Sequence, residues 1–152
     1  MPKDFIISIL VPSFNQEGLF KEHLKHKWEF NIYSLSCFCY TLAGIIRIKQ
    51  DNFNDGINLI LQSFISYMSD VHTLGTNSKW HLIDRYSAII VSIYHFYSLN
   101  SKSSIIINLL LFLVGFRYLK RSQIMYSLHD DNFLIEHTKW HFISILMAIT
   151  SN

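Results

Sequence analysis

The sequence has few charged residues, prolines, glycines and cysteines, and each shortage narrows the range of folds. Charged side chains make up 16% of the 152 residues, against about a quarter in an ordinary soluble domain. Two prolines and five glycines leave few sites for tight turns, while 12 Phe, 8 Tyr and 3 Trp add apolar bulk. The balance disfavours a strand-and-turn architecture and predicts one all-α domain, with a composition shifted toward membrane proteins.

The two cysteines, Cys37 and Cys39, lie two positions apart in an apolar stretch. On a helix they point in different directions and cannot form a disulfide with each other, so we expect small, buried, free thiols. The short apolar run that ends at Pro12 lacks a long basic region before it and a small-residue cleavage site after it. It does not predict a signal peptide.

Several common functional signatures are missing. The sequence contains no glycine-rich phosphate loop, no Cys-x-x-Cys pair and no G-x-S-x-G elbow. Residues 51–56 begin like a calcium loop, but Phe53 and Gln62 stand where such a loop needs oxygen ligands and a bidentate glutamate. The basic residues are not gathered on one base-reading element, so we expect no nucleic-acid partner.

Five apolar segments follow one another with short polar connections between them. They cover residues 29–48, 57–74, 81–99, 103–118 and 134–150. Connections this short predict antiparallel neighbours. We expect a polytopic transmembrane helical bundle of about five membrane helices over residues 29–152. None of the segments has 18 uninterrupted apolar residues, so a soluble helical bundle is the alternative.

Residues 1–28 form a separate N-terminal segment in this interpretation. Leu19, Phe20, Leu24 and Trp28 recur near helical spacing with lysine and histidine between them. This pattern is typical of an interfacial helix lying on a membrane surface. The alternative is a solvated, charged linker.

Basic residues sort unevenly if the five segments alternate across a bilayer. Nine fall on the N-terminal side and three on the other. The nine are Lys3, Lys21, Lys25, Lys27, Lys79, Arg117, Lys120, Arg121 and Lys139, and the three are Arg47, Lys49 and Lys102. A soluble bundle has no reason to sort its charges in this way. The bias predicts an integral membrane protein with a cytoplasmic N-terminus, in contact with the lipid bilayer.

Polar side chains interrupt the apolar segments, and inside a membrane such side chains are costly enough to suggest a function. The alternating topology places the end of the second segment and the starts of the third and fifth at one depth. The candidates at that depth are Ser66, Ser69, Asp70, His72, His81, Asp84, His137 and His141. Residues far apart in the sequence are therefore predicted to converge.

His137 and His141 stand four residues apart, so on a helix both imidazoles lie on one face and can bind one ion. A third nitrogen from His72 would complete a three-histidine set with a position left open for water, the arrangement of a catalytic zinc. Asp84 is then placed to act on that water, and a serine one turn before His72 to stabilise an oxyanion. The alternative for each histidine is an interfacial or capping role.

Two Lys-Trp-His sequences, at residues 79–81 and 139–141, mark the starts of the third and fifth segments. Little else around them matches, so they do not indicate a duplication. Trp80 and Trp140 are predicted to anchor two helices at the same membrane interface.

The stretch HTKWHFISILMA, which begins at His137, resembles the last-helix signature of the CREST superfamily of membrane hydrolases and receptors, which includes alkaline ceramidases and the progestin and adiponectin receptors. The stretch SYMSDVHTLGTNSKWHLID, from Ser66 to Asp84, is similar to that family's second-to-third helix region, in which a serine precedes a histidine and an aspartate follows. The family's serine usually stands four residues before its histidine, where this chain has Met68. The family also has seven membrane helices, two more than the segments found here.

The resemblance implies a Zn²⁺ ion held by His72, His137 and His141. It implies Asp84 as the acid/base residue and Ser69 as the catalytic serine. The expected activity is zinc-dependent hydrolysis of an amide or ester bond in a membrane lipid such as a ceramide, in a shortened relative that completes its chamber as a homo-oligomer. The alternative is a non-catalytic, receptor-like or scaffold membrane protein with a structural metal or none.

Overall fold

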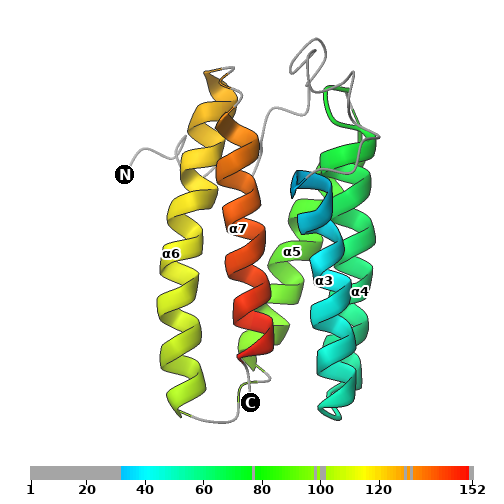
Figure 1. Ribbon diagram of the computed structural model, residues 1–152, viewed down its shortest axis with the longest axis vertical. Coiled ribbons are helices and arrows are strands. Elements are labelled where there is room, and N and C mark those ends of the chain that lie inside the picture. Colours follow the sequence, from blue (N-terminus) through cyan, green and yellow to red (C-terminus); the bar gives the residue numbers. More distant parts are fainter. Residues whose placement is uncertain are drawn as a thin grey trace.

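The computed structural model describes residues 32–76, 78–97, 99, 102–128, 130 and 132–150, and within them the chain is all-α, as predicted. The elements are α3 (Ile32–Lys49), α4 (Phe53–Tyr67), the π-helix η1 (Met68–His72), α5 (Trp80–Tyr97), α6 (Lys102–Ser127) and α7 (Asn132–Ile149). Successive α-helices run in opposite directions (Figure 1), which confirms the expectation drawn from the short connections. The predicted interfacial segment, residues 1–28, lies outside the described residues.

The five α-helices follow the five apolar segments closely, and α6 differs most. Its apolar stretch was expected to end at residue 118, whereas the helix continues to Ser127. Residues 117–126 include Arg117, Lys120, Arg121 and Met125, which are good helix formers. Hydropathy falls there while helix propensity does not, so α6 extends beyond its apolar part.

The helices pack in the order α6, α7, α3, α4, α5. Helices α3 and α4 approach closely at Gly44 and Gly56, where a Cβ atom added to Gly44 would lie 2.6 Å from the Gly56 carbonyl oxygen. Helix α5 packs mainly on α4, and it meets α6 near its last turn, where the rings of Phe96 and Phe112 lie 5.8 Å apart. A space is left between α5 and α6 toward the other end of the bundle.

A network of buried polar side chains links the helices at the end of the bundle where α3 connects to α4. The Nε of Arg47 donates a hydrogen bond of 2.8 Å to Oδ2 of Asp55, and both side chains are almost completely buried. Nδ1 of His95 lies 3.6 Å from the same oxygen, and Nε2 of His95 lies 3.3 Å from Oδ1 of Asn108. This network thus joins α3, α4, α5 and α6.

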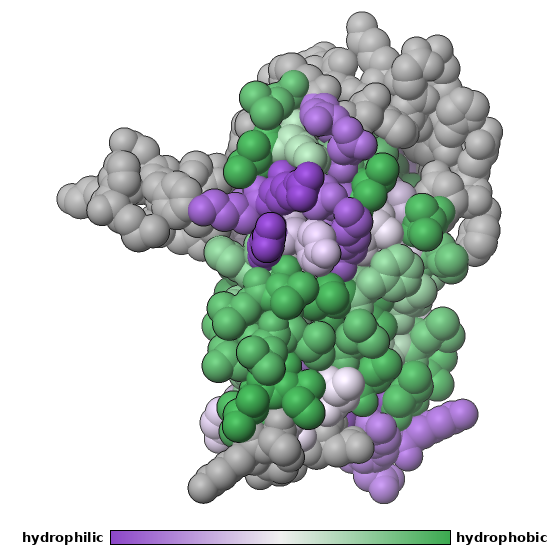
Figure 2. Space-filling model, turned by 60° about the vertical axis from the view of Figure 1, so that its left-hand side comes forward, coloured by the Kyte–Doolittle hydropathy of each residue, from purple (hydrophilic) through white to green (hydrophobic). Residues whose placement is uncertain are grey.

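The distribution of polar and apolar side chains is unusual for a water-soluble bundle. Among the described residues, 18 buried residues are polar or charged and 13 are apolar, whereas 26 large apolar side chains are exposed. Figure 2 shows a wide apolar band on the face it draws, with hydrophilic residues gathered above it. Within the described residues, no helix is both long enough and apolar enough to qualify as a membrane span.

Candidate metal centre

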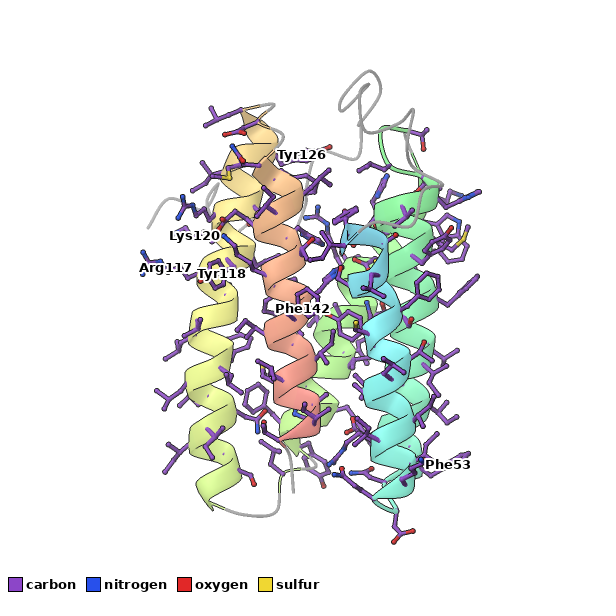
Figure 3. All side chains as sticks on the ribbon, in the orientation of Figure 1. Phe53, Arg117, Tyr118, Lys120, Tyr126 and Phe142 are labelled. Carbon is purple, nitrogen blue, oxygen red and sulfur yellow. The ribbon has the colours of Figure 1, made fainter. Side chains whose placement is uncertain are left out.

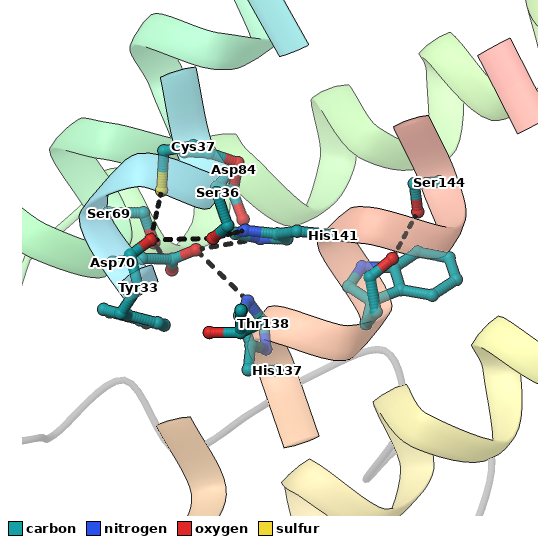
Figure 4. Close-up of polar contacts among 12 residues, drawn as sticks. Tyr33, Ser36, Cys37, Ser69, Asp70, Asp84, His137, Thr138, His141 and Ser144 are labelled. Carbon is teal, nitrogen blue, oxygen red and sulfur yellow. Dashed lines mark hydrogen bonds and ion pairs between the residues drawn. The ribbon is translucent and has the colours of Figure 1, made fainter. Parts of the chain in front are cut away.

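His137 and His141 on α7 meet Asp70 on η1 in the interior of the bundle (Figure 4). Oδ2 of Asp70 lies 3.1 Å from Nε2 of His137 and 3.4 Å from Nε2 of His141. Asp70 is 8% exposed and His141 only 2%. The wider turn of a π-helix changes the direction of the side chains that follow it, and such turns are frequent at functional sites. Here Asp70, in the middle of η1, faces α7.

The other nitrogen of His141 is held by Ser36 of α3. The Ser36 hydroxyl donates to the carbonyl oxygen of Tyr33 at 2.7 Å, and its oxygen lies 2.9 Å from Nδ1 of His141. Since the hydroxyl hydrogen is used on Tyr33, the serine oxygen accepts from Nδ1–H, and Nε2 then carries a lone pair. That lone pair faces a carboxylate oxygen, an arrangement that requires a proton or a metal ion between the two atoms.

A metal ion fits between these side chains. Ligand atoms of Cys37, Asp70 and His141 all lie within 4.8 Å of one another, and all three residues are buried. Two ligands bound at about 2.1 Å in tetrahedral geometry lie roughly 3.4 Å apart. The 3.4 Å between Asp70 and His141 matches that spacing, whereas His137, which contacts the same Asp70 oxygen, lies outside the three-residue set. The donors are oxygen, nitrogen and sulfur, a set that suits zinc and also other transition metals.

Asp84 of α5 lies beside this cluster and is held from α4. Its Oδ1 accepts hydrogen bonds from the Ser66 hydroxyl at 2.7 Å and from Nε2 of Gln62 at 2.8 Å. All three side chains are buried. Gln62 is fixed in turn by the Ser87 hydroxyl, which donates to its Oε1 at 2.8 Å. The carboxyl group of Asp84 therefore has a set orientation.

The predicted site residues are brought together in part. His137, His141 and Asp84 line one cavity, while His72 is not among the residues that line it. Asp70, two residues before His72, makes the contacts with both histidines of α7 instead. Asp70 was one of the polar candidates in the sequence, but the three-histidine pattern favoured His72. The sequence pattern does not predict the π-helix that presents Asp70.

The serine assignment changes in the same way. Ser69 lines the cavity, but its hydroxyl donates to Oδ1 of Asp70 at 3.0 Å and lies 3.1 Å from Nδ1 of His81. Ser66 is the serine that contacts Asp84. It stands four residues before Asp70 in the sequence.

The two Lys-Trp-His sequences have different surroundings. His81 contacts Ser69 through Nδ1 and the carbonyl oxygen of Thr76 through Nε2, so it fixes the connection between η1 and α5. Trp80 packs edge-on against Phe64. Trp140 lines the cavity, and its ring lies where a side chain on Gly115 of α6 would clash with it. Trp140 is therefore part of the α6–α7 contact rather than only a surface anchor.

The cavity beside the metal candidates has a volume of about 1000 Å³ and lies between α4, α5, α6 and α7. Its polar lining includes Ser66, Asp70, Asp84, His137 and His141. The wall along α5 and α6 is apolar and includes Ile89, Ile93, Leu109, Phe112 and Phe116. The polar cluster thus opens onto a space suited to an apolar molecule.

The structure thus places the contacts of Asp70 with His137 and His141 in the wall of a cavity that is largely apolar. Comparisons with protein-family models, with curated proteins and with solved structures found no match for the chain.

Proposed function

We propose that this chain is a membrane-embedded, metal-dependent hydrolase that cleaves an amide or ester bond of a lipid. The observation that carries the proposal is the contact of one carboxylate oxygen of Asp70 with Nε2 of both His137 and His141, in the wall of an apolar cavity. A buried carboxylate between two imidazoles, one of which is oriented by Ser36, is a typical way to hold a catalytic metal.

Asp70 and His141 would hold the ion together with the Cys37 thiol, and His137 lies beside them against the same oxygen of Asp70. A divalent cation bound there polarises a carbonyl group and activates water. A histidine, a carboxylate and a thiolate are donors that zinc accepts, which is compatible with the zinc implied by the resemblance, and Asp70 takes the place assigned to His72. Cys37 and Asp70 together favour a transition metal over magnesium or calcium, because a thiol is a poor partner for those hard cations.

Asp84 has the position of an acid/base residue. Within the described part of the chain its hydrogen bonds all go to Oδ1, which leaves Oδ2 to accept a proton from water or to deliver one to a leaving group. Ser66 is a positioning residue in this scheme, since its hydroxyl holds Asp84. Ser69 holds Asp70 in the corresponding way.

The distribution of side chains supports a lipid environment. Mean hydropathy counts every residue of a helix equally, whether it faces the inside or the outside of the bundle. In α5 the buried residues are His81, Asp84 and His95, whereas Ile83 and Ile90 are exposed and do not line the cavity. The average for the helix is therefore low although its outer surface is apolar, as expected of a helix that meets lipid outside and a polar site inside.

The basic residues support an orientation. Among the described residues, five exposed basic residues lie toward the end that carries the candidate metal centre, in addition to the half-buried Arg85: Lys79, Arg117, Lys120, Arg121 and Lys139. Figure 3 shows Arg117 and Lys120 near this end of α6, far from Phe53 at the other end of the bundle. At that other end, Arg47 is buried against Asp55, which leaves Lys49 and Lys102. The bias favours a cytoplasmic location for the metal end.

Elemental analysis of the detergent-purified protein tests the proposal. We expect about one transition-metal ion per chain, lost in Asp70→Ala and His141→Ala and retained in the matched control His72→Ala. Monodisperse elution of each variant separates loss of metal from loss of folding. Metal that is lost in His72→Ala and kept in Asp70→Ala would contradict the ligand set, and a metal-free wild-type protein would contradict the whole proposal.

Activity is measured on the metal-loaded protein as release of fatty acid from ceramide and from a monoacyl ester. We expect hydrolysis that disappears with a chelator and returns with the metal. Stoichiometric metal without hydrolysis of either substrate class would favour the non-catalytic, receptor-like alternative.

A further inference from the structure

We infer that the cavity binds an amphiphile with an anionic head group, a carboxylate or a phosphate, and that Arg85 recognises it. The inference deepens the proposed function, because it specifies the charge of the substrate. Its consequence for catalysis rests on the proposed function. The inference depends on the surroundings of Arg85, a cation in the wall of the cavity.

Arg85 lies on α5 directly after Asp84, is half-buried and lines the cavity. Consecutive residues on a helix point about 100° apart, so the two side chains do not face each other. Asp84 is turned toward Ser66 and Gln62 of α4. Within the described part of the chain, Arg85 makes no hydrogen bond or ion pair with any protein group.

The carboxylates of the cavity are already engaged elsewhere. The charge of Asp70 faces His137 and His141, and Oδ1 of Asp84 accepts two hydrogen bonds. A half-buried guanidinium group with no hydrogen-bonded partner carries a desolvation cost, which the nearby charges of Asp70 and Asp84 offset only in part and which a bound anion would reduce further. Arg85 is thus placed to attract an anion from outside the protein.

The chemistry of Arg85 suits a carboxylate or a phosphate. A guanidinium donates two parallel hydrogen bonds to two oxygens of one anionic group, which gives direction as well as charge. Lys120 and Gln123 of α6 line the same cavity and add a second positive charge and further polar groups. The apolar wall that continues along α5 and α6 would take the hydrocarbon part of the same molecule.

This arrangement has a consequence for the reaction. Arg85 is the sequence neighbour of Asp84, the proposed acid/base residue, so an anionic group held by Arg85 lies close to the reacting region. The bond to be cleaved would therefore lie near the anionic head group rather than at the far end of the hydrocarbon chain. An N-acyl amino acid and a lysophosphatidic acid are examples of molecules with a cleavable amide or ester bond near an anionic head group.

Binding to the full chain in lipid nanodiscs tests the inference, with Trp140 in the cavity wall as the fluorescent reporter. The probes share one alkyl chain: dodecanoate, dodecyl phosphate and the neutral dodecanamide. We expect at least one of the two anions to bind about tenfold or more tightly than the amide. Dodecanoate and dodecyl phosphate distinguish a carboxylate ligand from a phosphate ligand.

The variant Arg85→Gln should remove the preference for the anions and leave the affinity for dodecanamide unchanged. The matched control is Arg117→Gln, since Arg117 is exposed on α6, points away from the bundle (Figure 3) and does not line the cavity. It should keep the preference. An equal affinity of wild-type protein for all three probes, or a preference that survives in Arg85→Gln, would overturn the inference.

A chelated preparation separates this inference from the proposed function. If Arg85 holds the anion, the preference persists after the metal has been removed. If the preference disappears with the metal in the wild-type protein, the anion is a metal ligand and the role of Arg85 is refuted. A protein without metal that still prefers the anions would contradict the hydrolase while supporting the anion site.

Discussion

Removal of one partner from the buried Arg47–Asp55 pair should destabilise the bundle strongly. The exposed fractions of the two side chains are 5% and 0%, and they share a hydrogen bond of 2.8 Å, so either charge left alone would be buried with weaker partners only, His95 for Asp55 and Gln50 for Arg47. Such a loss costs about 3–5 kcal/mol. Because 1 kcal/mol shifts the melting temperature of a chain of this size by about 2–4 °C, Asp55→Ala and Arg47→Met should each lower it by roughly 6–20 °C.

The double variant Arg47→Met/Asp55→Leu distinguishes a paired charge from simple packing. It removes both charges and fills the site with apolar atoms, so it should be more stable than either single variant. Thermal unfolding in detergent is followed by far-ultraviolet circular dichroism and by tryptophan fluorescence. Lys49→Met, exposed near the same end of α3, is the control and should change stability by less than about 0.5 kcal/mol. A double variant as unstable as the sum of the single variants would refute the reasoning.

Two further predictions concern the helix contact and the chemistry. Gly44→Ala should destabilise the protein by about 1–3 kcal/mol, because its Cβ would lie 2.6 Å from the Gly56 carbonyl oxygen, and Asn54→Ala, exposed on α4, should not. Equal melting temperatures for the two variants would contradict the close α3–α4 contact. Asp84→Asn keeps the shape of the side chain and loses its proton-accepting capacity, so lipid hydrolysis should fall about 10²–10⁴-fold while metal content is unchanged. Loss of metal in this variant would instead place Asp84 among the ligands.

Much of the fold could be predicted from the sequence because apolar segments and short connections are local features. The five segments gave five helices and their alternating directions. The end of α6 was missed since hydropathy and helix propensity diverge after residue 118. The pair His137 and His141 was also predictable, because a spacing of four residues fixes their common face on any helix.

The third ligand candidate could not be found in this way. Counting along a regular helix favours His72, which continues the histidine pattern, whereas the wider turn of η1 directs Asp70 toward α7. The serine assignment moved with it, from Ser69 to Ser66, which contacts Asp84 across two helices. A local change in helical winding alters the direction of every side chain that follows it, so positions predicted by counting along a regular α-helix become wrong. The sequence pattern did not predict this π-helix.

The sequence by itself determined the helices and their alternating directions, because both depend on residue type and on distance along the chain. Only the tertiary structure decided which of those side chains meet. It placed Asp70 between two histidines, turned Asp84 toward α4 and left Arg85 in a cavity between α5 and α6. These outcomes depend on how five helices are rotated about their axes, and that rotation is set by packing contacts between residues far apart in the chain, such as Gly44 with Gly56 and Gly115 with Trp140.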